Sequence, residues 1–300
     1  MRVDHAIVPP ALKTATGAFI LLLGLIGFHA LSKRPLPLPE ASDFVRYVEM
    51  DRQARLETAI LRYRLPDGRT VDLIGAIHVA DAPYYAALNE RFRTYDSLLY
   101  ELVGNPEDLH VESKKPALLM VHTLQKGMMN VLDLSFQLDG INYRAPNFVH
   151  ADLTAEEFQQ RLDARGESLF TFMLKTAQAQ QAAEAGRSNT TISPWQLLKA
   201  LFSKDRSTRL KLLLAKQFDE METLLDAMDG GNEASVIIGE RNARAMEVLQ
   251  RELNAGKGHV GIFYGAGHLL DFERRLYQRG AKKIAHEWLT AWEIPILDGR

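Results

Sequence analysis

Two copies of a Gly-x-x-His motif stand far apart in this sequence, each directly after a short apolar run. Gly75 precedes His78, and Gly265 precedes His268. The glycine allows a sharp backbone turn, and the histidine follows the point where the apolar strand is expected to end. Because α/β sheets gather their ligands at the carboxyl ends of strands, we expect the fold to bring the two imidazoles together in one polar site.

A single acid interrupts the apolar run from Ser97 to Val103. Strand alternation places this acid, Glu101, on the same face as Leu99 and Val103. An ionised and unpaired carboxylate in apolar surroundings would be costly. Glu101 is therefore expected near the exposed end of the strand, paired with a cation, or bound to a metal ion.

Further polar residues stand at the starts of two predicted helices. Arg241 and Asn242 open one helix, where side chains and free amides can face an anion or a developing oxyanion. The alternative is an ordinary solvated helix start. His150 and Asp152 precede the other helix, and for these two we favour a role in helix entry.

The composition and the missing motifs exclude several classes of function. Cysteine is absent, which excludes disulfides, zinc–thiolate sites and thiol nucleophiles. No Gly-x-Ser-x-Gly elbow, phosphate-binding loop or His-Glu-x-x-His motif occurs. The net charge of −2, without an Arg/Lys-aromatic platform, argues against nucleic acid as a partner. A metal ion would have to be held by His, Asp, Glu or carbonyl oxygens.

The first motif is expected within a strand–helix–strand unit. Alternation over residues 55–64 and the turn sequence at 65–69 predict a β-hairpin that leads into the motif strand. After His78, Asp81 is a suitable N-cap for a helix, and residues 97–103 return as a strand. The order is that of a βαβ unit whose turn lies at the carboxyl end of its first strand.

The second motif is surrounded by elements in a similar order. The predicted helix, strand, helix and strand cover residues 240–254, 260–264, 269–278 and 282–293. The last of these contains Glu287, much as the first unit contains Glu101. The sequence thus predicts an α/β fold with a central mixed sheet and flanking helices, built from two similar βαβ halves that an ancient duplication would explain.

The N-terminal segment differs from the rest of the chain. Residues 15–31 are mostly apolar and carry no formal charge, a length that suits a spanning helix or the core of a signal peptide. We therefore expect residues 1–34 to be a signal or transmembrane anchor and residues 35–44 to be a stiff Pro-rich linker. The remaining domain, 45–300, would be membrane-anchored by a single span or exported.

The middle of that domain, about residues 113–230, is expected to be a helical insertion between the halves. Thr154 and Glu157 form a capping-box pattern at the start of one helix. Residues 168–185 are predicted to form a second helix. Apolar residues at helical spacing from Leu210 to Met228 predict a third, long amphipathic helix.

Several of these segments resemble one known family. They occur here in the order of the TraB/PrgY/TIKI family, with the paired Gly-x-x-His motifs as the most specific part, from about residue 45 to the C-terminus. The matching segments are Gly75–Val79, Tyr100–Glu101, Phe136–Tyr143, His150–Asp152, Glu240–Asn242 and Gly265–Leu269. The sequence departs from many members at Asp271–Phe272, where they carry a glycine, which is expected to alter a helix start.

The resemblance implies a fold and an activity. The family is grouped with the haem-binding ChaN-like and the erythromycin-esterase-like proteins, which share an α/β core of two similar halves. Its animal members are membrane-tethered metalloproteases that trim Wnt proteins, and its bacterial members act against peptide pheromones. Carried over, it implies His78, His268 and Glu101 as metal or catalytic residues, supported by Arg241 and Asn242.

The main hypothesis is a metal-dependent peptide hydrolase. His78 and His268 would hold a divalent Mn, Co or Zn ion, with Glu101 as third ligand or general base. Arg241 would stabilise the tetrahedral oxyanion. The alternatives are a protein that sequesters a peptide or haem through the same histidines, and motifs that only pack a sheet edge. The metal, the peptide or protein substrate and the oligomeric state stay open.

Overall fold

The computed structural model describes most of the predicted α/β domain. It covers residues 43–104, 107, 132–166, 194–228 and 236–296. The predicted anchor at 1–34, nearly all of the linker at 35–44 and the predicted helix at 168–185 lie outside the described residues. Within the described residues, no helix is long and apolar enough to span a bilayer.

A mixed central sheet forms the core of the domain, as the sequence predicts. Its strands are β1 (Val45–Met50), β2 (Gln53–Arg64), β3 (Thr70–Ala76), β5 (Ser97–Tyr100), β7 (Phe148–His150), β8 (His259–Gly265) and β9 (Lys282–Pro295). A separate small pair consists of β4 (Val79–Ala80) and β6 (Ser135–Phe136). The strands β3, β8, β5 and β7 lie in this order and are all parallel, whereas β1 and β9 both pair antiparallel with β2.

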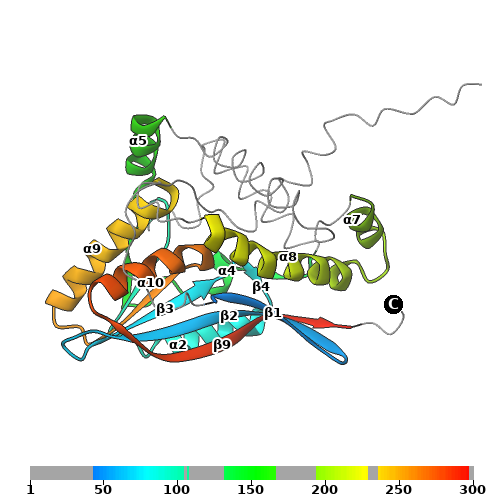
Figure 1. The fold of residues 1–300 in the computed structure, drawn as a ribbon, viewed down its shortest axis with the longest axis horizontal. Coiled ribbons are helices and arrows are strands. Elements are labelled where there is room, and N and C mark those ends of the chain that lie inside the picture. Colours follow the sequence, from blue (N-terminus) through cyan, green and yellow to red (C-terminus); the bar gives the residue numbers. More distant parts are fainter. Residues whose placement is uncertain (1–42, 105–106, 108–131, 167–193, 229–235, 297–300) are drawn as a thin grey trace, which may run out of the picture.

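Helices cover both faces of this sheet. They are α2 (Ala82–Phe92), α4 (Gln137–Gly140), α5 (Ala155–Arg165), α7 (Pro194–Leu201), α8 (Arg206–Met228), α9 (Arg241–Asn254) and α10 (Leu269–Gln278). Two short turns join them, the π-helical η2 (Val236–Glu240) and the 3-10 helical η3 (Ala266–His268). The apolar sides of α9 and α10 share one buried cluster with the sheet, and those of α2 and α8 share another, so the sheet lies between helical layers (Figure 1).

The elements around the first motif form as the sequence predicts. β2 and β3 make the expected antiparallel hairpin, from Arg64 opposite Thr70 to Ile60 opposite Ile74. Gly68 takes a φ of 90° in the turn between them, a conformation that glycine reaches without strain. Asp81 is the N-cap residue of α2, but its side chain makes no capping hydrogen bond and instead pairs with Lys211 of α8.

The prediction of two similar βαβ halves is wrong in its second half. β3, α2 and β5 do form a parallel crossover, although β8 lies between the two strands. β9, in contrast, runs antiparallel to β2 along its whole length. Its Glu287 is bonded to Arg91 of α2, so this acid does not correspond to Glu101. Alternating side chains show that a segment is a strand, but they do not show its direction.

The prediction of a wholly helical insertion over about residues 113–230 is wrong in part, because β7 within it pairs with β5 in the central sheet. The predictions for two of its helices are confirmed. Thr154 and Glu157 form the complete capping box at the start of α5. The long helix ends at Met228 as predicted, and it begins slightly earlier than predicted, at Arg206.

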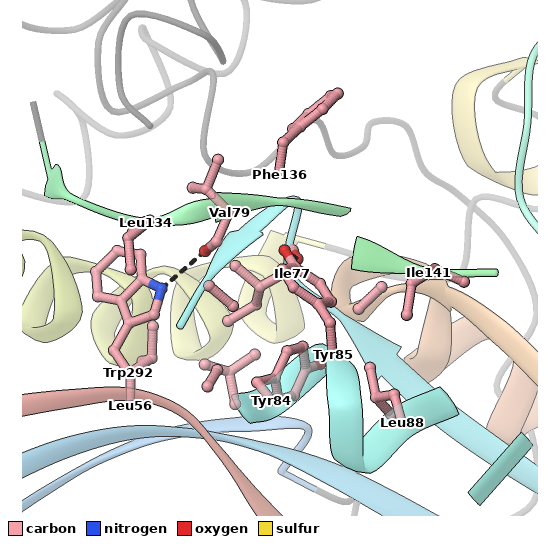
Figure 2. Packing of buried hydrophobic residues seen from close by; sticks show 14 of the residues in the cluster. Leu56, Ile77, Val79, Tyr84, Tyr85, Leu88, Leu134, Phe136, Ile141 and Trp292 are labelled. Atoms are coloured by element: carbon pink, nitrogen blue, oxygen red, sulfur yellow. Dashed lines mark hydrogen bonds between the residues drawn. The ribbon is translucent and has the colours of Figure 1, made fainter. Parts of the chain in front are cut away.

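Buried aromatic residues of α2 fix the backbone of the first motif. The Tyr84 hydroxyl donates to the Gly75 carbonyl at 2.8 Å, and the Tyr85 hydroxyl donates to the Ile77 carbonyl at 2.9 Å. Figure 2 shows these rings packed among the surrounding aliphatic side chains, with the Trp292 indole donating to the Val79 carbonyl. Side chains of the core therefore bond the backbone both before and after His78.

Candidate functional site

The two Gly-x-x-His motifs end neighbouring parallel strands. Ala76 of β3 lies opposite Gly265 of β8, so both histidines follow the same edge of the sheet. On the other side of β8, Tyr100 of β5 pairs with Phe263. Glu101 therefore follows this edge too, directly beside the second motif.

Glu101 lies just beyond β5, whereas the sequence predicts it inside that strand. Its side chain is only 16% exposed, and Oε1 accepts a hydrogen bond from Arg241 Nη2 at 2.6 Å. Its Oε2 accepts from the Gly265 backbone N–H at 2.7 Å. A β-carbon at Gly265 would lie 3.2 Å from Oε2, so the motif glycine provides the room for this carboxylate. The expectation of a cation partner is thereby met.

Arg241 binds two carboxylates at once. Besides Glu101, it pairs with the fully buried carboxylate of Asp152 through Nε at 2.9 Å and Nη2 at 2.7 Å. Its Nη1 donates to the Ile237 carbonyl and to His268 Nε2, both at 3.3 Å. Every nitrogen of the guanidinium already has an acceptor within the protein. Arg241 is therefore better suited to hold Glu101 and Asp152 in place than to bind an oxyanion, the role that the sequence predicts.

The expected free amides at Arg241 are not available either. The π-helical turn η2 runs directly into α9, and Glu240 already has helical dihedral angles. A helix start leaves backbone N–H groups free only in its first turn. The sequence shows where the polar residues lie, but it does not reveal this preceding turn.

The second-motif histidine has a defined tautomer. Asn242 Nδ2 donates to the His268 carbonyl at 3.0 Å and to Asp271 Oδ2 at 2.8 Å. Its Oδ1 is left as an acceptor, and it lies 2.6 Å from His268 Nδ1. The proton is therefore on Nδ1, and Nε2 presents a lone pair.

The first-motif histidine is arranged in the same way by a different amide. Gln137 Nε2 donates to the Tyr143 hydroxyl at 2.8 Å. Its Oε1 then accepts from His78 Nδ1 at 3.1 Å, so His78 also presents its Nε2 lone pair. The Gln137 backbone N–H donates to the His78 carbonyl at 2.9 Å, which fixes both ends of the histidine.

Burial and charge keep both Glu101 and His268 unprotonated. Burial lowers the pKa of His268 to about 4, which outweighs the opposing effect of Glu101. Burial alone would raise the pKa of the Glu101 carboxyl, but the Arg241 charge reverses this and the pKa lies well below its usual range. His268 Nε2 lies 3.7 Å from Glu101 Oε1, so the second-motif histidine and this carboxylate are direct neighbours.

Two residues of the cluster, Asp152 and Gln137, have roles that the sequence does not predict. Asp152 and His150 were expected to serve helix entry. Asp152 does bond the Leu153 backbone, but it also binds Arg241, and His150 Nε2 donates to the Leu102 carbonyl at 2.8 Å. No local pattern signals the role of Asp152, which follows from the pairing of β7 with β5. The same holds for Gln137, because its contact with His78 spans 59 residues.

The imidazole and carboxylate groups of the cluster are of the types that bind divalent ions, but they are not positioned together as a metal site. In the part of the chain that the structure describes, no three His, Cys, Asp or Glu side chains are placed to hold a metal ion together. The two Nδ1-protonated imidazoles nevertheless have the tautomer and the outer hydrogen bond that metal-binding histidines have in proteins. Two carboxylates, from Glu101 and Asp152, share the single cation of Arg241 and leave one negative charge beside them.

Comparison of this chain with protein-family models, with curated proteins and with solved structures finds no match. The geometry of the cluster and the resemblance of its motifs are therefore the grounds for a proposal about its function.

Proposed function

We propose that this chain is a membrane-anchored or exported peptide hydrolase of the TraB/PrgY/TIKI type, with His78, His268 and Glu101 at its centre. The observation that supports the proposal most is that the two histidines have the same position after a strand and the same tautomer. The two motifs follow neighbouring strands, and an amide oxygen accepts from Nδ1 of each ring, so that both rings keep their lone pair on Nε2. A bound ion would replace the 3.3 Å contact between His268 Nε2 and Arg241 Nη1. A site that only packs a sheet edge has no need of two such imidazoles.

The electrostatics favour a bound cation. Neutral imidazole and carboxylate oxygen are suitable ligands for Mn, Co or Zn. His78 and His268 would hold the ion, with Glu101 as the third ligand. When bound, a divalent ion would polarise the scissile carbonyl and lower the pKa of a water molecule.

The low pKa of Glu101 favours one of its two expected roles, metal ligand, over the other, general base. A general base is most effective when its pKa lies near the working pH. The pKa of Glu101 lies well below that range, mainly because the charge of Arg241 overcomes the effect of burial. Glu101 is therefore better suited to bind a cation than to accept a proton.

The surrounding residues position this centre. Arg241 fixes Glu101 and approaches His268 Nε2, and Asp152 fixes Arg241 in turn. Asn242 and Gln137 orient the two imidazoles. In the sequestering alternative a haem iron would have to reach His268, whose residue surface is only 3% exposed, so burial favours a small ion over haem.

The proposal is tested by incubating the detergent-purified full-length protein with a peptide library, with and without a chelator. We expect cleavage that the chelator stops and that added Mn, Co or Zn restores. The Glu101→Gln variant should lose at least about 100-fold in rate, because it removes the charge that the cation needs.

Glu287→Gln is the matched control, since Glu287 is an exposed acid paired with Arg91 far from the cluster. It should cleave peptides at the wild-type rate. Full activity of Glu101→Gln would refute the proposed centre, and binding of peptide or haem without any cleavage would support sequestration instead.

A further inference from the structure

One helix exposes several large apolar side chains. Along α7 and the residue after it, Trp195 is 71% exposed and Phe202 is 80% exposed, with Leu198 and Leu201 also exposed. The opposite side packs inward, since Ala200 is 3% exposed and belongs to the core cluster shared with α8. Figure 1 shows α7 beyond the end of α8, away from the sheet.

The exposed residues form a continuous stripe. Trp195, Leu198 and Phe202 are spaced by three and four residues, so they lie along one face of a helix. The Phe202 backbone N–H still bonds to the Leu198 carbonyl at 3.1 Å, which keeps Phe202 in line with the helix. An amphipathic helix of a globular protein normally turns such a stripe toward the core, and a large exposed apolar patch marks an interaction surface.

The same segment is rich in exposed cations. They are Lys199, Lys204, Arg206 and Arg209, with Asp205 as the one acid between Pro194 and Arg209. In the described part of the chain no salt bridge joins any of these four cations to an acid. A basic segment on a protein whose net charge is −2 is a local feature, and its complement is an anionic surface.

We infer that α7 and the turn that follows it dock onto an anionic lipid surface. An aromatic and aliphatic stripe bordered by lysine and arginine is the arrangement found in helices that lie in the membrane interface. Tryptophan is favoured at that depth because its ring is apolar and its N–H can face water. The basic residues would add attraction to anionic headgroups.

The positive charge around α7 favours a lipid surface over a second copy of the chain as the binding partner. In a symmetric dimer the same patch would face itself, which would bring together two sets of cations that form no salt bridge within the described residues. A membrane surface instead supplies negative charge and apolar depth at the same place. The inference is independent of the proposed hydrolase activity.

The test uses the full-length protein in nanodiscs whose lipids carry bromine on their acyl chains. Trp195 fluorescence, obtained by subtracting the signal of Trp195→Phe, should be quenched strongly in discs that contain phosphatidylglycerol and less in phosphatidylcholine alone. The double variant Lys204→Glu/Arg206→Glu should weaken docking about fivefold or more for each reversed charge. Its quenching should fall toward the level in neutral lipid.

Phe202→Glu should also reduce the quenching, without a change in thermal unfolding, because the Phe202 side chain is exposed. Ile284→Glu is the matched control, an exposed apolar residue near the start of β9, and it should leave the quenching unchanged. The inference is overturned if Trp195 is not quenched in anionic discs, or if it is quenched equally in neutral ones. A dimer in detergent that Phe202→Glu dissociates would also overturn it.

Discussion

Two charge clusters stand at opposite ends of the parallel strands, and both combine carboxylate, guanidinium and imidazole groups. At the amino ends, Asp72 of β3 accepts from Arg62 Nε at 2.7 Å and from the Tyr95 hydroxyl at 2.8 Å. His259, the first residue of β8, lies 3.4 Å away from the same carboxylate. The cluster at the carboxyl ends contains Glu101 and Arg241.

The difference lies in the balance of charge and in exposure. Asp72 is matched by one guanidinium, and the Arg62 side chain is 36% exposed. At the other end two carboxylates share Arg241, whose side chain is 8% exposed, beside a neutral His268. The first cluster is a complete ion pair that ties strands together. The second keeps a residual negative charge beside two imidazoles, although the Nε2 lone pair of His268 accepts a hydrogen bond from Arg241 Nη1 at 3.3 Å.

Removing the arginine from each cluster should produce the largest difference. Arg241→Met leaves two buried carboxylates without a cation, so the free energy of unfolding should fall by about 3–5 kcal/mol. Arg62→Met should cost about 1–2 kcal/mol, because Asp72 keeps the Tyr95 hydroxyl as a donor. Urea unfolding of both variants measures the two losses. An equal loss of unfolding free energy in both variants would show that the two clusters contribute equally to stability.

The low pKa of His268 should appear in the pH dependence of stability. Burial lowers this pKa from 6.5 to about 4, so the unfolded chain binds more protons between these two values. The free energy of unfolding should therefore fall as the pH is lowered from 6.5 to 4, by about 3 kcal/mol. His268→Gln has no proton to bind in this window and should show a flatter pH profile. Profiles with the same slope would mean that His268 is not held neutral.

The smallest expected effect concerns the orientation of His78. Gln137→Met keeps the length of the side chain but removes the acceptor for His78 Nδ1. Loss of such an outer contact should lower the proposed peptide cleavage about ten- to a hundredfold, with little change in thermal unfolding. Gln159→Met, on the exposed side of α5, serves as control and should match the wild type. Undiminished cleavage by Gln137→Met would show that the proposed activity does not depend on the contact that sets the tautomer of His78.

The parts of this arrangement that sequence could predict are those that depend on local patterns. The glycine before each histidine and the apolar run before it predict a strand end, and parallel strands then place such ends on one edge. The pairing of Glu101 with a cation was among the expectations because a buried lone carboxylate is costly.

The remaining parts depend on which strands are neighbours. The link between Asp152 and Arg241 follows from the position of β7 beside β5, which no local pattern specifies. The antiparallel direction of β9 is likewise decided by its long pairing with β2 rather than by its own residues. The outward stripe around Trp195 has the same spacing as a core-facing one, so only the packing of α7 reveals it.

The most direct test of the central claim is elemental analysis of the purified full-length protein. We expect about one divalent transition ion per chain in the wild type, and its loss in the double variant His78→Ala/His268→Ala. His259→Ala, which changes the cluster at the amino ends, should keep the ion. A wild type that binds no ion under metal-replete conditions, or a double variant that retains it, would contradict the proposal that the two motifs share one cation.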